Sequence, residues 1–208
     1  MEDVAAPQSE PTARDWSLLP MDALASIFVR LGAVEVLMGA GLVCHSWLEA
    51  AKLPDVWRTV VFENHKVLYQ KDETVVRATA KAAVDRSDGQ LRVFAGTRFV
   101  NDELMEYILE RSPSLTTLRL EFCGYVFTKR LVNAIRESPL LQLRNLELDG
   151  AYITVGELTD ILESCPILEV LLLRHCPMIY DDDEPVETMT IDRDDEMLWL
   201  YFSDCEYD

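Results

Sequence analysis

Three nine-residue segments repeat one pattern of leucines: LTTLRLEFC at residues 115–123, LRNLELDGA at residues 143–151 and LEVLLLRHC at residues 168–176. Leucine occupies the first, fourth and sixth position of each segment, and a small residue occupies the ninth. The middle leucines, Leu118, Leu146 and Leu171, are separated by 28 and 25 residues. Because side chains alternate between the faces of a strand, each segment predicts a strand with its leucines on one face. One such unit cannot bury its leucines alone, so we expect the units to stack.

A helix-like stretch precedes each of these strands and ends in a similar phrase: ILERSP at residues 108–113, AIRESP at 134–139 and ILESCP at 161–166. Leu104, Leu131 and Leu158 each stand four residues before another aliphatic residue, so every predicted helix has one apolar face. A period of about 20–29 residues with this leucine spacing is the signature of leucine-rich repeats. The predicted fold class is an α/β solenoid within an α+β chain, with a parallel sheet on the concave face and helices on the convex face.

The pattern continues more weakly toward the N-terminus. Leu91-x-Val93 lies 27 residues before Leu118 and is predicted to be the preceding strand. Val60-x-Phe62 lies 31 residues before Leu91 and is predicted to be the first strand. The helix between these two strands would carry Val75, Val76, Ala80 and Ala83. We therefore assign residues 59–176 to the repeats.

The last part of the chain is acidic. Residues 177–208 contain 12 acidic residues and one basic residue, so most of the net charge of −18 lies there. We interpret residues 177–196 as a solvated acidic loop, with attraction of a basic partner as an alternative. Residues 197–208 begin with the β-prone sequence MLWLYF, and Leu198 lies 27 residues after Leu171. This segment is therefore expected to pair with the strand of Leu171 and to cap the array.

Residues 15–58 have a different, helical pattern. The first predicted helix has apolar residues at positions i, i+3, i+4 and i+7: Leu24, Ile27, Phe28 and Leu31. Two more short helices are predicted, over residues 34–40 and 42–51. A core of three short helices is small, and this segment has more apolar surface than it can bury internally. The excess indicates a surface that binds a partner.

Residues 15–60 resemble an F-box. The resemblance rests on two phrases and their separation, Leu-Pro-x-Asp-x-Leu-x-x-Ile-Phe from Leu19 and Val-Cys-x-x-Trp from Val43. The other matching residues are Leu31, Leu37, Pro54, Trp57 and Arg58. His45 departs from the pattern, because the family usually has lysine or arginine after Val-Cys. Together with the repeats, residues 15–176 resemble a small plant-type F-box/leucine-rich-repeat protein.

This resemblance implies a substrate-receptor subunit of an SCF ubiquitin ligase. The F-box would bind a Skp-type adaptor, the adaptor would bind a cullin, and the repeats would bind a protein substrate. The resemblance implies no catalytic residue, no cofactor and no metal. Two alternatives stay open: a truncated relative that binds Skp without delivering a substrate, and a general protein-interaction scaffold. A short repeat array with an acidic end is the main departure from the family pattern.

The resemblance and the strand pattern define two sets of candidate binding residues. The residues expected to bind the Skp adaptor are Leu19, Pro20, Leu24, Ile27, Phe28, Leu31, Val43, Cys44 and Trp47. On the strands, the residues between the leucines face the open side of the sheet. The candidates for substrate binding are Arg119, Glu121, Glu147, Asp149, Leu172 and Arg174. A solvated sheet with Arg119–Glu147 and Asp149–Arg174 pairs is the alternative.

Composition excludes several other classes of protein. Because the chain of 208 residues carries a net charge of −18, we expect no binding to nucleic acid. Residues 36–44 form the longest apolar run, which is far shorter than a membrane span, so we expect no membrane segment.

The five cysteines contain no CxxC pair and are interpreted as reduced thiols of an intracellular protein of the nucleus or cytoplasm. His175 and Cys176 are adjacent in sequence, so they would face opposite sides of a strand and cannot form a nucleophile–base pair. Residues 1–14 are expected to be a disordered leader.

Overall fold

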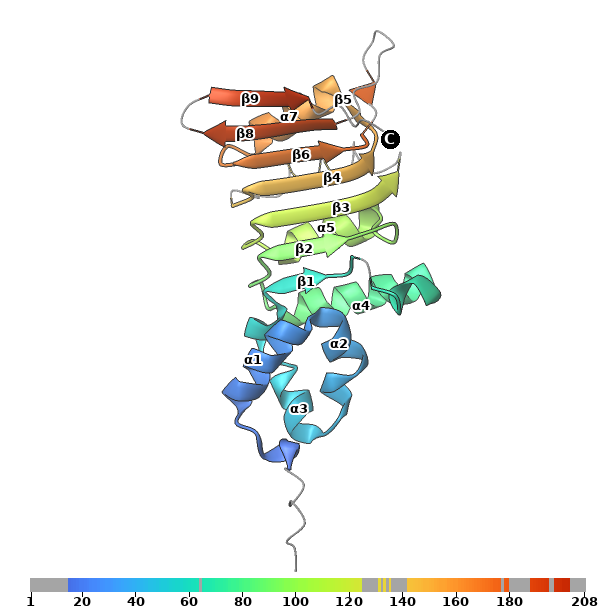
Figure 1. Cartoon of the computed structure of the whole chain (residues 1–208), viewed down its shortest axis with the longest axis vertical. Coiled ribbons are helices and arrows are strands. Elements are labelled where there is room, and N and C mark those ends of the chain that lie inside the picture. The colour runs from blue at the N-terminus through green and yellow to red at the C-terminus, as the bar shows by residue number, and fades with distance from the viewer. Residues whose placement is uncertain are drawn as a thin grey trace, which may run out of the picture.

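The computed structural model describes residues 15–63, 65–124, 131, 133, 135, 142–176, 178–179, 188–194 and 197–202. Short helices at the N-terminal end lead into a sheet in which strands and helices alternate along the chain (Figure 1). The leader predicted at residues 1–14 and the acidic cluster at residues 181–184 lie outside the described residues.

The segment that resembles an F-box, residues 15–58 and called the F-box segment below, is built from short helices. They are η1 (Trp16–Leu18), α1 (Met21–Leu31), α2 (Ala33–Met38), η2 (Ala40–Leu42), α3 (His45–Ala50) and η3 (Pro54–Trp57). Gly32, with φ of +94°, lies between α1 and α2 and allows the sharp change of direction there. The helix predicted over residues 42–51 is shorter in the structure, because Cys44 is extended (φ −158°, ψ 174°) and α3 begins after it.

The repeat part contains a seven-stranded sheet with the order β1-β2-β3-β4-β6-β8-β9. Its strands are β1 (Thr59–Val61), β2 (Val93–Gly96), β3 (Thr117–Gly124), β4 (Asn145–Ala151), β6 (Val170–Arg174), β8 (Thr188–Asp194) and β9 (Met197–Phe202). The first five strands are parallel. A separate small sheet pairs β5 (Ile153–Thr154) with β7 (Met178–Ile179).

Helices connect β1 to β2, β2 to β3 and β4 to β6, and they lie against one face of the sheet. They are α4 (Glu73–Arg86), α5 (Asp102–Arg111) and α7 (Val155–Ser164), with η4 (Leu68–Gln70) before α4. In Figure 1, α5 and α7 lie behind the strands. Each of the three α-helices begins at a capping side chain: Asp72 for α4, Asn101 for α5 and Thr154 for α7. These caps satisfy amide groups that would otherwise lack partners at the helix start.

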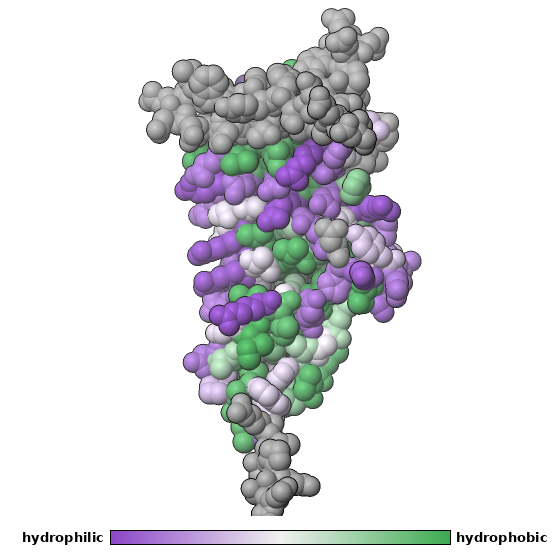
Figure 2. Space-filling view, in the orientation of Figure 1, coloured by the Kyte–Doolittle hydropathy of each residue, from purple (hydrophilic) through white to green (hydrophobic). Residues whose placement is uncertain are grey.

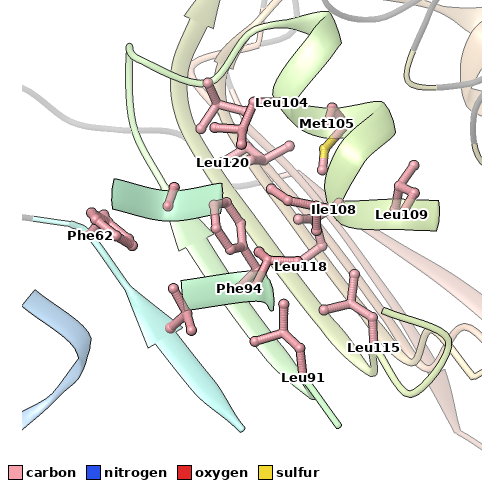
Figure 3. Packing of buried hydrophobic residues seen from close by; sticks show 14 of the residues in the cluster. Phe62, Leu91, Phe94, Leu104, Met105, Ile108, Leu109, Leu115, Leu118 and Leu120 are labelled. Atoms are coloured by element: carbon pink, nitrogen blue, oxygen red, sulfur yellow. The ribbon is translucent and has the colours of Figure 1, made fainter. Parts of the chain in front are cut away.

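The register of β3, β4 and β6 confirms the predicted repeat. Leu118, Leu146 and Leu171 lie opposite one another, and so do Leu120, Leu148 and Leu173. All six leucines are at most 1% exposed. Figure 3 shows Leu118 and Leu120 packed with Leu104 and Ile108 of α5 and with Phe94 of β2. Burial of this apolar surface is what drives the strand–helix units to stack.

The predicted alignment of the upstream strands is wrong by three residues. Leu91 was expected opposite Leu118, but Phe94 lies there and pairs in turn with Val60 of β1. Gly96 lies opposite Leu120, and a Cβ atom at Gly96 would approach Val100 Cγ2 to 2.5 Å. A leucine therefore does not fit at this position, and its absence hides the LxL pattern in β2.

The C-terminal end of the sheet also differs from the prediction. β9 does not pair with β6, because β8 lies between them and both new pairings are antiparallel. β8 falls inside residues 177–196, which were predicted to be an acidic loop. The alternation of β-branched and apolar residues in Thr188-Met189-Thr190-Ile191 favours a strand in spite of the neighbouring acids. The array therefore ends in an antiparallel hairpin and not in a further repeat.

One continuous hydrophobic core joins the F-box segment to the repeats. It extends from Leu24 in α1 to Cys176 after β6. Trp57 lies at the junction, has no exposed surface, and donates a hydrogen bond from Nε1 to the Ala51 carbonyl (3.0 Å). Arg86 of α4 lies over the Trp57 ring, 5.1 Å from its centroid.

In the part of the chain that the structure describes, no single helix is long and apolar enough to span a membrane. The segments Met21–Leu31 and Ala33–Leu42 reach that length and hydropathy only together, and they are bent by 116°.

Candidate interaction surfaces

Exposed apolar side chains are concentrated on the F-box segment. Leu18 is 78% exposed, Leu42 72% and Val43 64%. Other large apolar residues exposed on this segment are Trp16, Met21, Ile27, Val29 and Leu31. Figure 2 shows hydrophobic residues gathered over this part of the visible face, while hydrophilic residues dominate over the sheet. An exposed apolar patch of this kind usually marks a protein-binding surface.

The structure divides the nine residues that were expected to bind the Skp adaptor into three groups. Pro20, Ile27, Leu31 and Val43 are exposed, and Leu19, Cys44 and Trp47 are partly buried. Leu24 and Phe28 have no exposed surface. The prediction is corrected for these two residues, because a fully buried side chain cannot contact a partner.

Phe28 and Trp47 link the surface of the F-box segment to its core. Their rings meet edge to face with centroids 5.6 Å apart. Trp47 Nε1 also donates a hydrogen bond to the Trp16 carbonyl (3.1 Å), and Ser46 Oγ donates one to the Ser17 carbonyl (2.9 Å). These two bonds hold η1 beside α3, so the exposed Trp16 and Leu18 stay next to the rest of the apolar surface.

Trp16, Leu18, Val29 and Leu42 were missed by the sequence prediction. Val29 lies off the i, i+3, i+4, i+7 stripe of the first helix, and the other three residues lie outside that helix, so the stripe did not select them. The signal that could have found them is a large apolar side chain that the predicted helical core does not use.

The open face of the sheet contains a cavity of about 280 Å³. It is lined by Glu63, Arg119, Leu120, Glu121, Glu147, Leu148, Asp149, Leu172 and Arg174. All six residues predicted as the substrate-binding face are in this set. The parallel register brings them together, because Arg119, Glu147 and Leu172 lie opposite one another. Glu121, Asp149 and Arg174 form the next row.

Arg119 lies between two carboxylates in this cavity. Its Nε is 3.5 Å from Glu147 Oε1 on the neighbouring strand, and its Nη1 is 3.8 Å from Glu63 Oε2. Glu63 follows β1, so Arg119 reaches toward it across β2. Ala95 is the β2 residue opposite Arg119, and its methyl side chain leaves the space for this reach. The Arg119–Glu147 pair is thus observed as the sequence predicted.

Asp149 makes a different contact from the one predicted. It lies opposite Arg174 in the register, but its Oδ1 contacts Nδ1 of His175 at 2.9 Å. His175 has a left-handed backbone (φ +48°), and this turns its ring toward the preceding strand end. The residues at the same repeat position, Phe122 and Gly150, are also left-handed, with φ of +54° and +65°. A left-handed residue therefore recurs at this repeat position, within β3 and β4 near their C-terminal ends and directly after β6.

Glu63 is the cavity residue that sequence reasoning missed. Its side chain is only 13% exposed, and Oε1 is buried without a hydrogen-bond partner among the described residues. Burial raises the pKa of Glu63, the nearby carboxylates of Glu121 and Glu147 raise it further, and Arg119 opposes the increase. Glu63 comes two residues after Val61, the last residue of β1, so strand alternation could have placed Glu63 on the same side of the sheet as Val61.

The thiols have contrasting environments. Cys165 is fully buried, and burial raises its pKa to about 11. Burial also raises the pKa of Cys176. Cys44 differs, because hydrogen bonds from the Ser46 hydroxyl and from the Trp47 amide lower its pKa. In the described ranges, histidines, cysteines and carboxylates do not form a group of three or more that could hold a metal ion.

Comparison with known families covers both parts of the chain. The F-box-like family model matches residues 16–63. The model described as "FBD-associated F-box protein At5g56370, LRR repeats" matches residues 89–181.

Known proteins of Arabidopsis thaliana are similar along most of the chain. "Putative F-box/LRR-repeat protein 23" is 33% identical over 168 residues, which cover 80% of this chain and 36% of that protein. "Putative F-box/LRR-repeat protein 9" is 34% identical over 166 residues, covering 77% and 66%. "F-box protein SKIP19" is 32% identical over 195 residues, covering 89% and 63%. The chain thus spans between about a third and two thirds of the length of these relatives. An F-box model matches the first part of the chain, a repeat model matches the part that follows, and the similar proteins are plant F-box and F-box/LRR-repeat proteins. The chain therefore belongs to the plant F-box/leucine-rich-repeat proteins.

Proposed function

We propose that this chain is a substrate-recognition adaptor of an SCF-type ubiquitin ligase. The F-box segment binds a Skp-type adaptor and, through it, a cullin, while the open face of the repeat sheet binds a protein substrate. The observation that carries the proposal is the concentration of exposed apolar side chains on the segment that matches the F-box model. We also propose that the stacked strand–helix units form a leucine-rich-repeat solenoid with the strands on its concave face.

The proposed Skp-binding surface consists of the residues of the predicted set that have accessible surface, together with the neighbours found in the structure. They are Trp16, Leu18, Leu19, Pro20, Ile27, Leu31, Leu42, Val43, Cys44 and Trp47. Leu24 and Phe28 hold this surface from beneath. Large apolar anchors, Trp47 among them, would supply most of the affinity. The chain contributes no catalytic group in this role, since it acts by bringing the substrate close to the ligase.

Co-purification with a Skp adaptor tests the adaptor assignment. Val43→Asp places a charge in the proposed interface and should weaken the complex at least about tenfold. Val155→Asp is the matched control, because Val155 is also an exposed valine but lies on α7. Replacement of both Leu19 and Pro20 by alanine should also weaken the complex. If the unmodified chain forms no complex in gel filtration, the assignment is wrong.

Cys44 offers a second, independent measurement of the same surface. Its lowered pKa and partial exposure make it more reactive toward iodoacetamide than Cys165, which is buried. Binding of the Skp adaptor should slow the labelling of Cys44 and leave Cys165 unlabelled in both states. Unchanged labelling of Cys44 in a stable complex would place the adaptor on another surface.

The substrate part of the proposal needs its own test. Depletion of the chain should cause at least one protein to accumulate, and degradation profiling measures this directly. If Skp binding is retained and no protein accumulates, the chain is a relative that occupies Skp without delivering a substrate.

A further inference from the structure

Carboxylates outnumber guanidinium groups in the lining of the cavity on the open face of the sheet. Glu63, Glu121, Glu147 and Asp149 line it, against Arg119 and Arg174. Asp149 already contacts His175. The four carboxylates against two guanidinium groups favour a bound cation over a bound anion within this space of about 280 Å³.

The ion pairs inside the cavity are long. Arg119 lies 3.5 Å from Glu147 and 3.8 Å from Glu63, beyond the distances of about 2.7–3.2 Å at which an N–H group donates well to oxygen. Glu63 Oε1 and Arg119 Nε are both buried without a hydrogen-bond partner in the part of the chain that the structure describes. A buried carboxylate oxygen in this state is costly, and a donor that enters the cavity would remove the cost.

We propose that this cavity binds the side chain of an arginine in an unphosphorylated segment of the substrate protein, with Glu63 as the main acceptor. The inference rests on the proposed function and names the chemical class that the sheet face selects. A guanidinium group presents several N–H donors in one plane and matches carboxylate geometry. Leu172, which lies opposite Glu147, offers an apolar wall for the methylene groups of the arginine.

The same charges disfavour a phosphorylated substrate. A phosphate group carries close to two negative charges and binds where several arginines are free to surround it. Arg119 faces two carboxylates here, and Glu121 and Asp149 separate it from Arg174 in the sheet. A phosphoserine in this cavity would meet Glu63, whose Oε1 has no hydrogen-bond partner among the described residues, so we expect it to bind elsewhere or not at all.

Titration of the isotopically labelled full chain with short peptides tests the proposal by NMR. The probes are acetyl-Gly-X-Gly-amide peptides in which X is arginine, its neutral isostere citrulline, or phosphoserine. The arginine peptide should shift the backbone signals of Arg119, Glu147 and Leu172, whereas citrulline should not. Glu63→Gln should weaken arginine binding at least about fivefold. Glu106→Gln is the matched control, because it removes the same charge from the exposed face of α5.

Each result decides the proposal. Equal shifts by arginine and citrulline, an equal loss of affinity in the two variants, or binding of phosphoserine in the cavity would overturn it. The Skp measurement is separate. Arginine binding without a Skp complex would retain the cavity and reject the adaptor role, whereas a Skp complex without arginine binding would retain the adaptor role and reject this substrate class.

Discussion

At the scale of single residues, a left-handed backbone recurs near the C-terminal end of the repeat strands, at Phe122 in β3, at Gly150 in β4 and at His175 directly after β6. Only glycine adopts this backbone without steric cost. At Gly150 an added Cβ would also lie 3.2 Å from Phe122 Cδ1. Gly150→Ala should therefore lower the free energy of unfolding by about 1–2 kcal/mol. Gly156→Ala is the opposite case, because a Cβ there has open space in the first turn of α7, and it should raise that free energy by about 0.5 kcal/mol. Denaturant unfolding measures both, and equal effects would refute the argument.

Glu63 predicts a pH dependence of stability. Its pKa is raised above the ordinary value of 4.5 by burial and by neighbouring carboxylates. The unfolded chain therefore releases this proton at a lower pH than the folded chain does, so ionisation of Glu63 lowers stability as the pH rises through the two pKa values. Glu63→Gln should stabilise the protein at pH 7 and lose this advantage below about pH 4. Unfolding curves of both proteins across this range provide the measurement. A constant difference between the two proteins would contradict the assignment.

At the scale of elements, the leucine ladder decides the stability of the sheet. Leu146 lies in the central repeat strand, is fully buried and is flanked by Leu118 and Leu171. Leu146→Asp buries an unpaired charge and should cost more than about 4 kcal/mol, with loss of the sheet signal in circular dichroism. Glu147→Gln, one residue later on the open face, should change stability by less than about 1 kcal/mol. A normally folded Leu146→Asp protein would show that the register is wrong.

The strands with dense leucines could be predicted from sequence, and the others could not. β3, β4 and β6 each carry both inward leucines, so periodicity alone fixes their alignment. β2 has Phe94 and Gly96 at those positions, because the loop after it brings Val100 into the space of a side chain. This contact is a tertiary one, so no periodic pattern in the sequence indicates it. β8 was missed because the acidic composition of its neighbourhood outweighed a short alternation.

The same holds for the candidate sites: residues placed by strand alternation could be predicted from the sequence, and residues placed by contacts between elements could not. The six residues of the sheet face follow from strand alternation, and all of them line the cavity. Glu63 lies beyond the end of β1, and its side chain meets Arg119 only because Arg119 reaches toward it across β2. On the F-box segment, the helical stripe combines inward residues such as Leu24 with outward ones such as Leu31. Helical spacing cannot tell these apart, because residues seven positions apart lie on nearly the same side of a helix.

At the scale of the whole molecule, the F-box segment and the repeats share one hydrophobic core. The sequence indicates two modules with different periodicity, but their buried residues form a single cluster. Trp57 fills the junction, and His65 Nε2 contacts Glu35 Oε1 at 2.7 Å between the β1–α4 connection and α2. A continuous core without a weak boundary favours cooperative unfolding.

This continuity predicts that damage to one part is felt in the other. Leu24→Ala in α1 and Leu146→Ala in β4 both empty fully buried positions, and each should lower stability by about 2–5 kcal/mol. Under cooperative unfolding, each variant should reduce the hydrogen-exchange protection of both α1 and β4 by the same free energy, because both elements exchange through the same global opening. Mass spectrometry resolves the two elements in separate peptides. If each variant reduces protection only in its own element, the F-box segment and the repeats unfold independently, and the junction at Trp57 does not couple them.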